Sequence, residues 1–416
     1  MRRFLSLVIV VSLGFLAGCG GSSSSASTPV GVPTGGGSGN TLPIAVDGGP
    51  QAPNILYPNG AFASVTICNP GTTTCQTIDG ILVDTGSFGL RILASEITLT
   101  GLETLTSGNS TLYNCINFAD GSYLWGTAAV ADVEMAGEKA SSETIQAIAD
   151  PTAFSIPTEC SNGGTDEDNL AGLGANGILG IGPEPVDCGE ACDPSFNGGV
   201  PPVPDPYYLC STSCTATSVS ISQQVQNPVA LFTTDNNGTI VELPALTGAA
   251  ASETGSLIFG IGTETNNQLP ASALIFALDQ ANGDTFSTTY KGQLLADSFI
   301  DLGSNGLFFP DATIPLCAAP DASFYCPASL LSLSAVNTET VSVTGATSTV
   351  DFSIDNADNL FAEGTGADVA FSTLGGPNAG GFDYGLPFFY GRNVFTSIDG
   401  ATNLPSGTPA APWWAY

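Results

Sequence analysis

Residues 81–87 read Ile-Leu-Val-Asp-Thr-Gly-Ser, an apolar run that stops at a carboxylate and a turn. Such a run predicts a buried strand that delivers Asp84 into a tight turn. The pattern Asp-x-Gly-Ser-x-Gly-Leu of residues 84–90 returns at residues 301–307. A repeat on this scale indicates two similar lobes, each presenting one aspartate.

The composition sets limits on the fold and the chemistry. With 416 residues, 43% of them hydrophobic and 11% charged, the chain can bury a large core in one to three domains. Its 51 Gly and 28 Pro favour short strands joined by turns. The net charge of −32 excludes a nucleic-acid partner, and the absence of His excludes Ser-His and Cys-His catalysis. Any general acid or base must then be a carboxylate, and we expect no metal and no cofactor.

At this point the sequence resembles the pepsin-like aspartic peptidases, in which two lobes each contribute an Asp-Thr-Gly turn. Further landmarks follow in the family's order: residues 118–122 at the flap, 176–182 as the hydrophobic-hydrophobic-Gly segment, 255–260 at the opening of lobe two, and 385–389 near its end. The resemblance covers residues 44–416. More closely, the pattern is similar to a bacterial lipoprotein family catalogued only as a domain of unknown function, which supplies no activity.

The resemblance implies an all-β, bilobal pepsin-like architecture with lobes related by a pseudo-twofold axis and few short helices. Like charges held close cannot both ionise cheaply, so one carboxyl keeps a proton while the other acts as a base. Asp84 and Asp301 match this dyad, which activates a water in the family. Thr85 matches the threonine that braces the two turns, and Ser87 and Ser304 match the hydroxyls that hold the outer carboxylate oxygens.

Three positions depart from the family pattern. Leu302 stands where the second bracing Thr or Ser belongs, and Arg91 replaces a Trp. Phe118 stands where the flap Tyr would hydrogen-bond to that Trp. If Arg91 points inward, its charge favours a doubly ionised dyad; if it points outward, it is a solvated surface residue. Because of these three departures we expect any activity to be weak, and we expect it to be best at acid pH because one carboxyl of the dyad must stay protonated.

Residues 116–137 predict a β-hairpin followed by a strand, placed as a flap over Asp84 or else as an ordinary surface hairpin. Other expected strands lie at residues 63–68, 77–83 and 128–135, and a hairpin is expected across residues 229–241. The candidate substrate-binding residues are Phe118, Asp120, Gly121, Tyr123 and Arg91.

Residues 1–19 resemble a lipoprotein signal peptide, with two arginines, an apolar stretch and Leu-Ala-Gly-Cys at the end. The alternative is an ordinary signal peptide with a coincidental Cys. Cleavage before Cys19 and acylation of its sulfur would anchor the chain to the envelope, at the outer membrane of a Gram-negative bacterium. Residues 20–43 are rich in Gly and Ser and predict a flexible tether. We assign residues 44–226 to an N-terminal lobe and 227–416 to a C-terminal lobe.

Ten further cysteines predict five disulfides, because an exported chain meets an oxidising compartment. The short loops favour Cys68 with Cys75 and Cys317 with Cys326, and we also pair Cys115 with Cys160. The insertion at residues 183–215 contains four cysteines, which we expect to pair among themselves: Cys188, Cys192, Cys210 and Cys214. A thiolate metal site there is the alternative.

The sequence leaves two classes of function open. One is an aspartic endopeptidase acting on a peptide in the inter-lobe cleft. The other is an inactive pepsin-like shell that serves as a binding module or an envelope surface protein. In both cases we expect a monomer that meets the membrane only through its lipid anchor.

Overall fold

The computed structural model describes residues 39–51, 54–149, 154–202, 205–362 and 368–416. The predicted signal peptide, the predicted lipidation site Cys19 and most of the predicted tether lie outside these ranges. The described part is mostly β-structure with three short α-helices, which confirms the predicted fold class: α1 Thr158–Ser161, α2 Leu170–Leu173 and α3 Ala357–Ala362. None of its helices has the length and apolar character needed to cross a membrane.

The N-terminal half contains a closed barrel-like sheet of six strands. Backbone pairing runs from β2 to β3, β10, β4, β9 and β8 and returns to β2. The strands of this half are β1 Thr41–Val46, β2 Phe62–Cys68, β3 Cys75–Asp84, β4 Phe88–Leu93, β5 Glu103–Thr104, β6 Thr106–Ser107, β7 Ser110–Asn117, β8 Tyr123–Met135, β9 Glu138–Ile148, β10 Gly177–Ile181, β11 Tyr207–Cys210 and β12 Cys214–Ala216.

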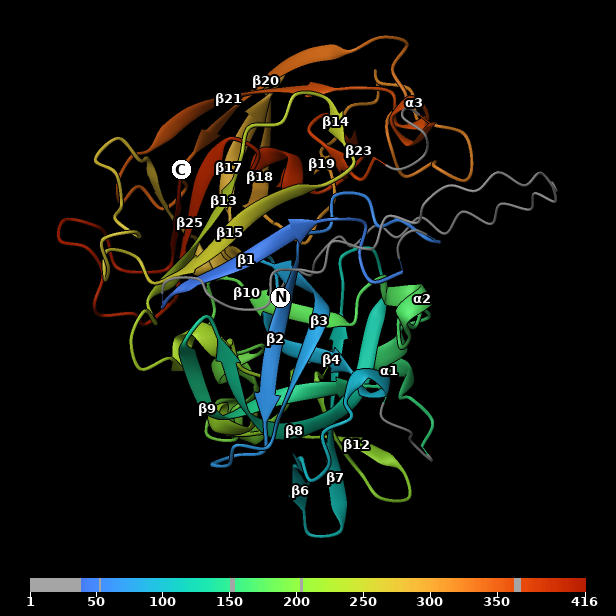
Figure 1. Cartoon of the computed structure of the whole chain (residues 1–416), viewed down its shortest axis with the longest axis vertical. Helices are drawn as coiled ribbons and strands as arrows, with labels where there is room; N and C mark the ends of the chain where they lie inside the picture. Colours follow the sequence, from blue (N-terminus) through green and yellow to red (C-terminus); the bar gives the residue numbers. More distant parts are fainter. Residues whose placement is uncertain (1–38, 52–53, 150–153, 203–204, 363–367) are drawn as a thin grey trace, which may run out of the picture.

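The C-terminal half contains a nearly closed seven-stranded sheet in the order β21-β20-β17-β18-β24-β19-β23. The strands of this half are β13 Gly238–Leu243, β14 Ala249–Ala250, β15 Glu253–Phe259, β16 Ile275–Ala277, β17 Phe286–Tyr290, β18 Gln293–Ile300, β19 Leu307–Phe308, β20 Leu331–Thr338, β21 Thr347–Ile354, β22 Ala370–Phe371, β23 Gly375–Gly376, β24 Asp383–Tyr384, β25 Arg392–Ser397 and β26 Trp413–Ala415. Figure 1 shows the two sheets as separate masses, which indicates two lobes.

The repeated motif occupies equivalent places in the two sheets. In the first, β3 pairs parallel with β10, β10 antiparallel with β4, and β4 parallel with β9. In the second, β18, β24, β19 and β23 repeat this sequence of parallel, antiparallel and parallel pairings. Each aspartate of the repeat therefore stands where its strand, β3 or β18, ends.

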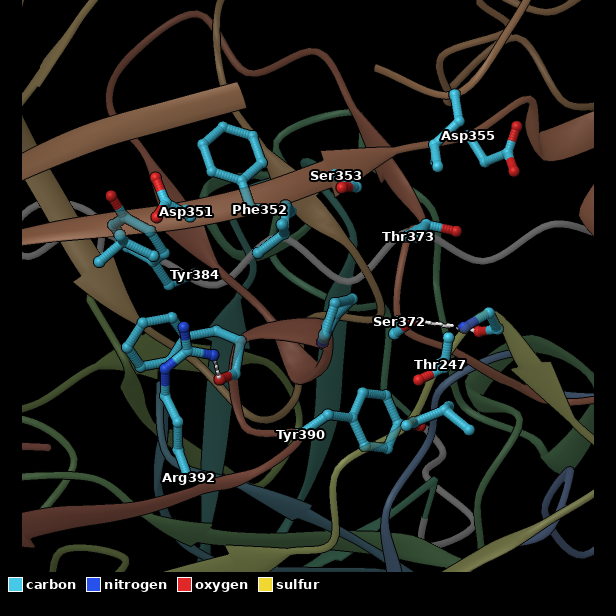
Figure 2. Close-up of a pocket in the computed structure, with 17 residues that line it drawn as sticks. Thr247, Asp351, Phe352, Ser353, Asp355, Ser372, Thr373, Tyr384, Tyr390 and Arg392 are labelled. Atoms are coloured by element: carbon cyan, nitrogen blue, oxygen red, sulfur yellow. Dashed lines mark hydrogen bonds between the residues drawn. The ribbon is translucent and has the colours of Figure 1, made fainter. Parts of the chain in front are cut away.

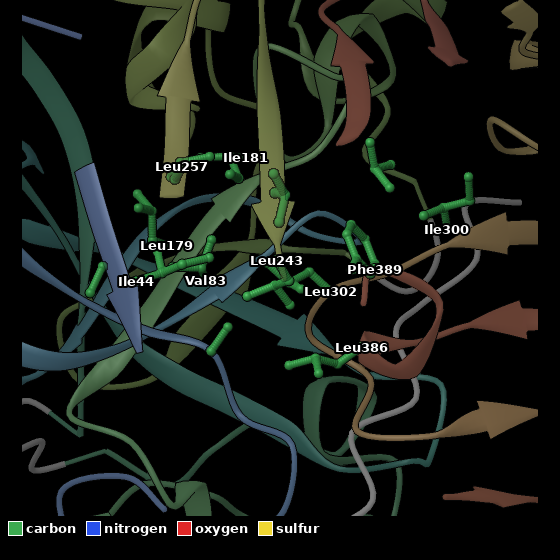
Figure 3. Close-up of a cluster of buried hydrophobic side chains, with 14 of the residues drawn as sticks. Ile44, Val83, Leu179, Ile181, Leu243, Leu257, Ile300, Leu302, Leu386 and Phe389 are labelled. Atoms are coloured by element: carbon green, nitrogen blue, oxygen red, sulfur yellow. The ribbon is translucent and has the colours of Figure 1, made fainter. Parts of the chain in front are cut away.

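A sheet and an apolar core join the halves. The N-terminal β1 pairs along its whole length with β15 (Figure 1) and at one position with β2. The sheet continues from β15 through β13, β25, β26 and β16. Beneath it lies a buried cluster with side chains from both halves, shown in Figure 3: Ile44, Val83, Leu179, Ile181, Leu243, Leu257, Ile300, Leu302, Leu386 and Phe389.

The ten cysteines form the expected five disulfides. The bonds are Cys68–Cys75, Cys115–Cys160, Cys188–Cys192, Cys210–Cys214 and Cys317–Cys326. The strands expected at residues 63–68, 77–83 and 128–135 are present within β2, β3 and β8. The hairpin predicted across residues 229–241 is wrong, because Pro228–Leu231 forms a 3-10 helix whose first turn is capped by the Asn227 side chain.

Asn59 links the segment before β2 to the C-terminal half. Its side chain is fully buried, donates to Asn305 O at 2.8 Å and Phe371 O at 2.9 Å, and accepts from Phe371 N at 2.7 Å. We expect Asn59→Ala to lower the free energy of unfolding by about 2–3 kcal/mol, because it leaves buried backbone groups without partners. Urea denaturation measures this, with exposed Asn109→Ala as the control. Equal losses in both variants would contradict the linking role.

Candidate active site

Asp84 stands at the carboxyl end of β3 and is fully buried. The turn that follows brings its own donors to the carboxylate. The amide of Gly86 donates to Asp84 Oδ1 at 2.8 Å, and the Ser87 hydroxyl donates to Asp84 Oδ2 at 2.5 Å. The Asp-Thr-Gly-Ser sequence thus holds both oxygens of one carboxyl group by local contacts.

Asp301 follows β18 and is held in the same way. It is fully buried, the amide of Gly303 donates to its Oδ1 at 2.8 Å, and Ser304 Oγ lies 2.8 Å from its Oδ2. The repeat in the sequence is therefore a repeat in hydrogen bonding.

The structure brings the two turns face to face. Thr85 Oγ1 accepts from the amide of Leu302 at 2.9 Å and donates to Ile300 O at 3.4 Å. A methyl group added at Gly303 would lie 2.6 Å from Asp84 Oδ1 and 3.2 Å from Asp301 Oδ1, so both carboxyl groups border the same glycine. They also hydrogen-bond to each other.

Burial shifts the pKa values of both carboxyl groups upward. Burial raises the pKa of Asp301 well above its usual range, and the negative charges of Asp84 and Asp383 raise it further. Burial also raises the pKa of Asp84, against the opposing effect of its hydrogen bonds to Ser87 and Asp301. A pair of this kind retains one proton and can supply an acid and a base together.

The sequence reasoning missed a third buried carboxyl group, Asp383 on β24. Ser304 Oγ lies 2.7 Å from Asp383 Oδ2 as well as 2.8 Å from Asp301 Oδ2. A hydroxyl has one proton to donate, so one of these two carboxyl groups must itself be protonated and donate to Ser304. Burial raises the pKa of Asp383 well above its usual range. The signal in the sequence was a lone acid inside an apolar stretch, residues 382–390.

Leu302 occupies the place of the missing bracing hydroxyl. Its side chain is fully buried and lies in the apolar cluster between the halves (Figure 3). The side-chain hydrogen bonds between the two turns are therefore made by Thr85 alone of this pair, and Leu302 contributes apolar packing instead.

Arg91 points into the N-terminal lobe, where its charge is paired. It is 1% exposed, and its Nη2 donates to Asp187 Oδ2 at 3.1 Å. Its Nη1 donates to Asn114 Oδ1 at 2.5 Å and Gln146 Oε1 at 2.7 Å. Among charged groups, Asp84 and Asp383 raise the pKa of Asp301 most.

The predicted flap is a hairpin of β7 and β8 with its turn at residues 118–122. Phe118 is buried in it, whereas Asp120 and Gly121 are exposed at the tip, and Asp120 Oδ1 accepts from the Ser122 amide and hydroxyl. Tyr123 is buried at the base, and its hydroxyl donates to Asp166 at 3.1 Å.

The sequence reasoning missed Tyr57, a buried phenol that precedes β2. It packs in one buried cluster with Phe118, and its hydroxyl has no partner among the described residues. Burial raises the pKa of Tyr57 well above its usual range, and the nearby charges of Glu167, Asp84 and Asp301 raise it further. A buried phenol close to the dyad is a candidate donor to a bound ligand, in place of the hydroxyl that Phe118 lacks.

Among the described residues, potential metal ligands gather at two places, each made of one disulfide and one carboxylate. They are Cys68–Cys75 with Glu134 and Cys317–Cys326 with Asp358. Sulfur atoms in a disulfide carry no thiolate to bind a metal. Neither group offers the ligand set of a metal centre.

Comparison with known proteins supports the resemblance to a family of unknown function. A search against functionally curated proteins finds no match. The family model described as "Protein of unknown function (DUF3443)" matches residues 36–416, which include every strand of the structure. The chain therefore belongs to the DUF3443 family.

Proposed function

We propose that this protein is a pepsin-like aspartic endopeptidase with Asp84 and Asp301 as its catalytic dyad. One observation carries the proposal: two fully buried carboxyl groups on repeated Asp-x-Gly-Ser turns hydrogen-bond to each other across a single glycine. Five disulfides are typical of an exported protein, and we propose lipid anchoring at Cys19 in the envelope.

The chemistry follows from the different environments of the two carboxyl groups. The negative charge of Asp383 favours the protonated form of Asp301, so we assign the shared proton to Asp301 and the role of base to Asp84. Asp84 removes a proton from a water, whose oxygen bonds to the peptide carbonyl carbon while Asp301 protonates the carbonyl oxygen. The tetrahedral adduct then expels the amine, which takes up the proton held by Asp84, while one hydroxyl of the adduct returns its proton to Asp301, and two peptides leave. Ser87, Ser304 and Thr85 hold the geometry.

Because both carboxyl groups are fully buried, a substrate reaches them only after the covering residues move. Tyr57 lies between β1 and β2 in the sequence and packs in the buried cluster that contains Phe118 of the flap. We propose that residues 54–61 and the flap turn open together, after which the Tyr57 hydroxyl donates to the bound peptide.

Replacing either aspartate tests the proposal. We expect Asp84→Asn and Asp301→Asn each to lower peptide hydrolysis at least about a hundredfold, because each removes the acid or the base. Asp79→Asn is the matched control, since Asp79 lies exposed on the same strand β3. Hydrolysis in ¹⁸O-labelled water, followed by mass spectrometry, shows whether the new carboxyl terminus carries the label.

A second candidate is a non-catalytic peptide-binding protein. The observation that favours it is the complete burial of Asp84 and Asp301, which leaves no surface for a substrate to touch in this state. If the wild type and both aspartate variants are equally inert over a peptide library from pH 3 to pH 7 and bind peptides equally well, the peptidase proposal fails and this one holds.

A further inference from the structure

A cavity of about 410 Å³ lies in the C-terminal half. Its walls come from residues 246–248, from β21 and from residues 384–392, and they include neither Asp84 nor Asp301. The walls carry large apolar side chains, among them Leu246, Phe352 and Tyr390. A concave apolar surface with a few polar groups is the usual form of a small-molecule site.

The cavity holds a cation that has no acidic partner. Three of the four basic side chains in the described ranges form ion pairs: Arg91, Lys139 and Lys291. The fourth, Arg392, forms none there, although the chain has 38 acidic residues. Its Nη1 donates to Phe388 O at 2.6 Å, and its guanidinium lies 4.5 Å from the Phe388 ring centroid. These contacts fix its position without neutralising its charge.

Asp351 lies on the same side of the cavity as Arg392 but forms no ion pair with it. Figure 2 shows Asp351 and Arg392 on one side of the cavity, with Thr373 and Asp355 on the other. Asp351 is exposed and forms no ion pair within the described residues. The Oγ1 of Thr373 is buried and has no hydrogen-bond partner there. A guanidinium and a carboxylate that face one cavity separately offer complementary charges to a ligand that carries both signs.

We propose that this cavity binds a free amino acid with a large apolar side chain. Arg392 binds the α-carboxylate through its planar fork of donors, and Asp351 accepts from the α-ammonium group. The side chain lies against the apolar wall formed by Phe352 and Tyr390. A simple anion fits less well, because Asp351 and the net charge of −32 repel it, and a simple amine leaves Arg392 without a partner.

Three probes that share one ring separate these alternatives in titration calorimetry with the purified chain. They are L-phenylalanine, 3-phenylpropionate, which lacks the ammonium group, and phenethylamine, which lacks the carboxylate. We expect L-phenylalanine to bind at least about tenfold more tightly than either partial analogue, as the loss of one charge-assisted hydrogen bond predicts. Equal or tighter binding of either analogue, or no binding of L-phenylalanine at millimolar concentration, would overturn the proposal.

Variants test which side chain binds each charged group of the ligand. Arg392→Gln should weaken the binding of L-phenylalanine at least tenfold, so that L-phenylalanine no longer binds more tightly than phenethylamine. Arg392→Lys should keep part of this difference in affinity. Asp351→Asn should make L-phenylalanine bind no more tightly than 3-phenylpropionate.

Glu264→Gln is the control: it makes the same charge change as Asp351→Asn on an exposed residue outside the cavity and should not change the binding of any probe. If Arg392→Gln is folded and binds L-phenylalanine as the wild type does, the assignment is wrong. Asp84→Asn should bind normally, so this result is independent of hydrolysis.

Discussion

The free energy of unfolding is expected to rise by about 5 kcal/mol or more when the pH is lowered from 8 to 4. The reason is a set of buried acids whose pKa values burial raises: Asp84, Glu143, Glu167, Asp205, Asp301 and Asp383. Burial, with the charges of Asp120 and Asp166, raises the pKa of Glu167 to about 8 from 4.5, and burial raises that of Asp205 to about 7 from 3.8.

The sign follows from proton uptake. Between about pH 4 and the raised pKa values, the folded chain binds more protons than the unfolded chain, so stability is highest at the acid end and falls as the pH rises. A pKa that is higher by one in the folded chain corresponds to about 1.4 kcal/mol, so Glu167 alone contributes about 5 kcal/mol of lost stability by pH 8. Below about pH 4 the trend reverses, because Lys139 and Lys291 lower the pKa values of Asp132 and Asp311.

Urea denaturation between pH 3 and pH 8 measures this dependence. Glu143→Gln is the informative variant, because Glu143 is fully buried and neither carboxyl oxygen has a partner within the described residues. It should exceed the wild type in stability at pH 8 and match it near pH 4. Wild-type stability that stays constant or increases from pH 4 to pH 8 would contradict the assignment of raised pKa values.

The parts of the site that the sequence predicted are those fixed by short-range geometry. In each turn, the aspartate oxygens are held by the amide two residues later and the hydroxyl three residues later, so the motif alone specifies the arrangement. Hydrogen bonds across the lobes, such as Thr85 to Leu302, follow once the two turns meet.

The missed features depend on contacts between distant residues. Asp383 reaches the dyad only because β24 pairs with β18, and no pattern near Asp383 shows that pairing. Tyr57 comes near the dyad through the path of the segment before β2. The direction of Arg91 was left open because it depends on Asp187, which lies 96 residues away in the chain.

Replacing Arg91 is expected to cause a large loss of stability. Its partner Asp187 also accepts from Asn114 Nδ2 at 2.9 Å and from the Tyr207 hydroxyl at 2.5 Å, so the network joins β4, β7 and β11. We expect Arg91→Leu to lower the free energy of unfolding by about 3–5 kcal/mol at pH 7, because it leaves a buried carboxylate without its counter-charge.

The double variant Arg91→Leu with Asp187→Leu distinguishes loss of a charge partner from loss of packing. If the uncompensated carboxylate of Asp187 causes most of the loss, the double variant should be more stable than Arg91→Leu alone, since no buried charge remains. If the two effects simply add, Arg91 stabilises the lobe through packing, and the ion pair contributes little.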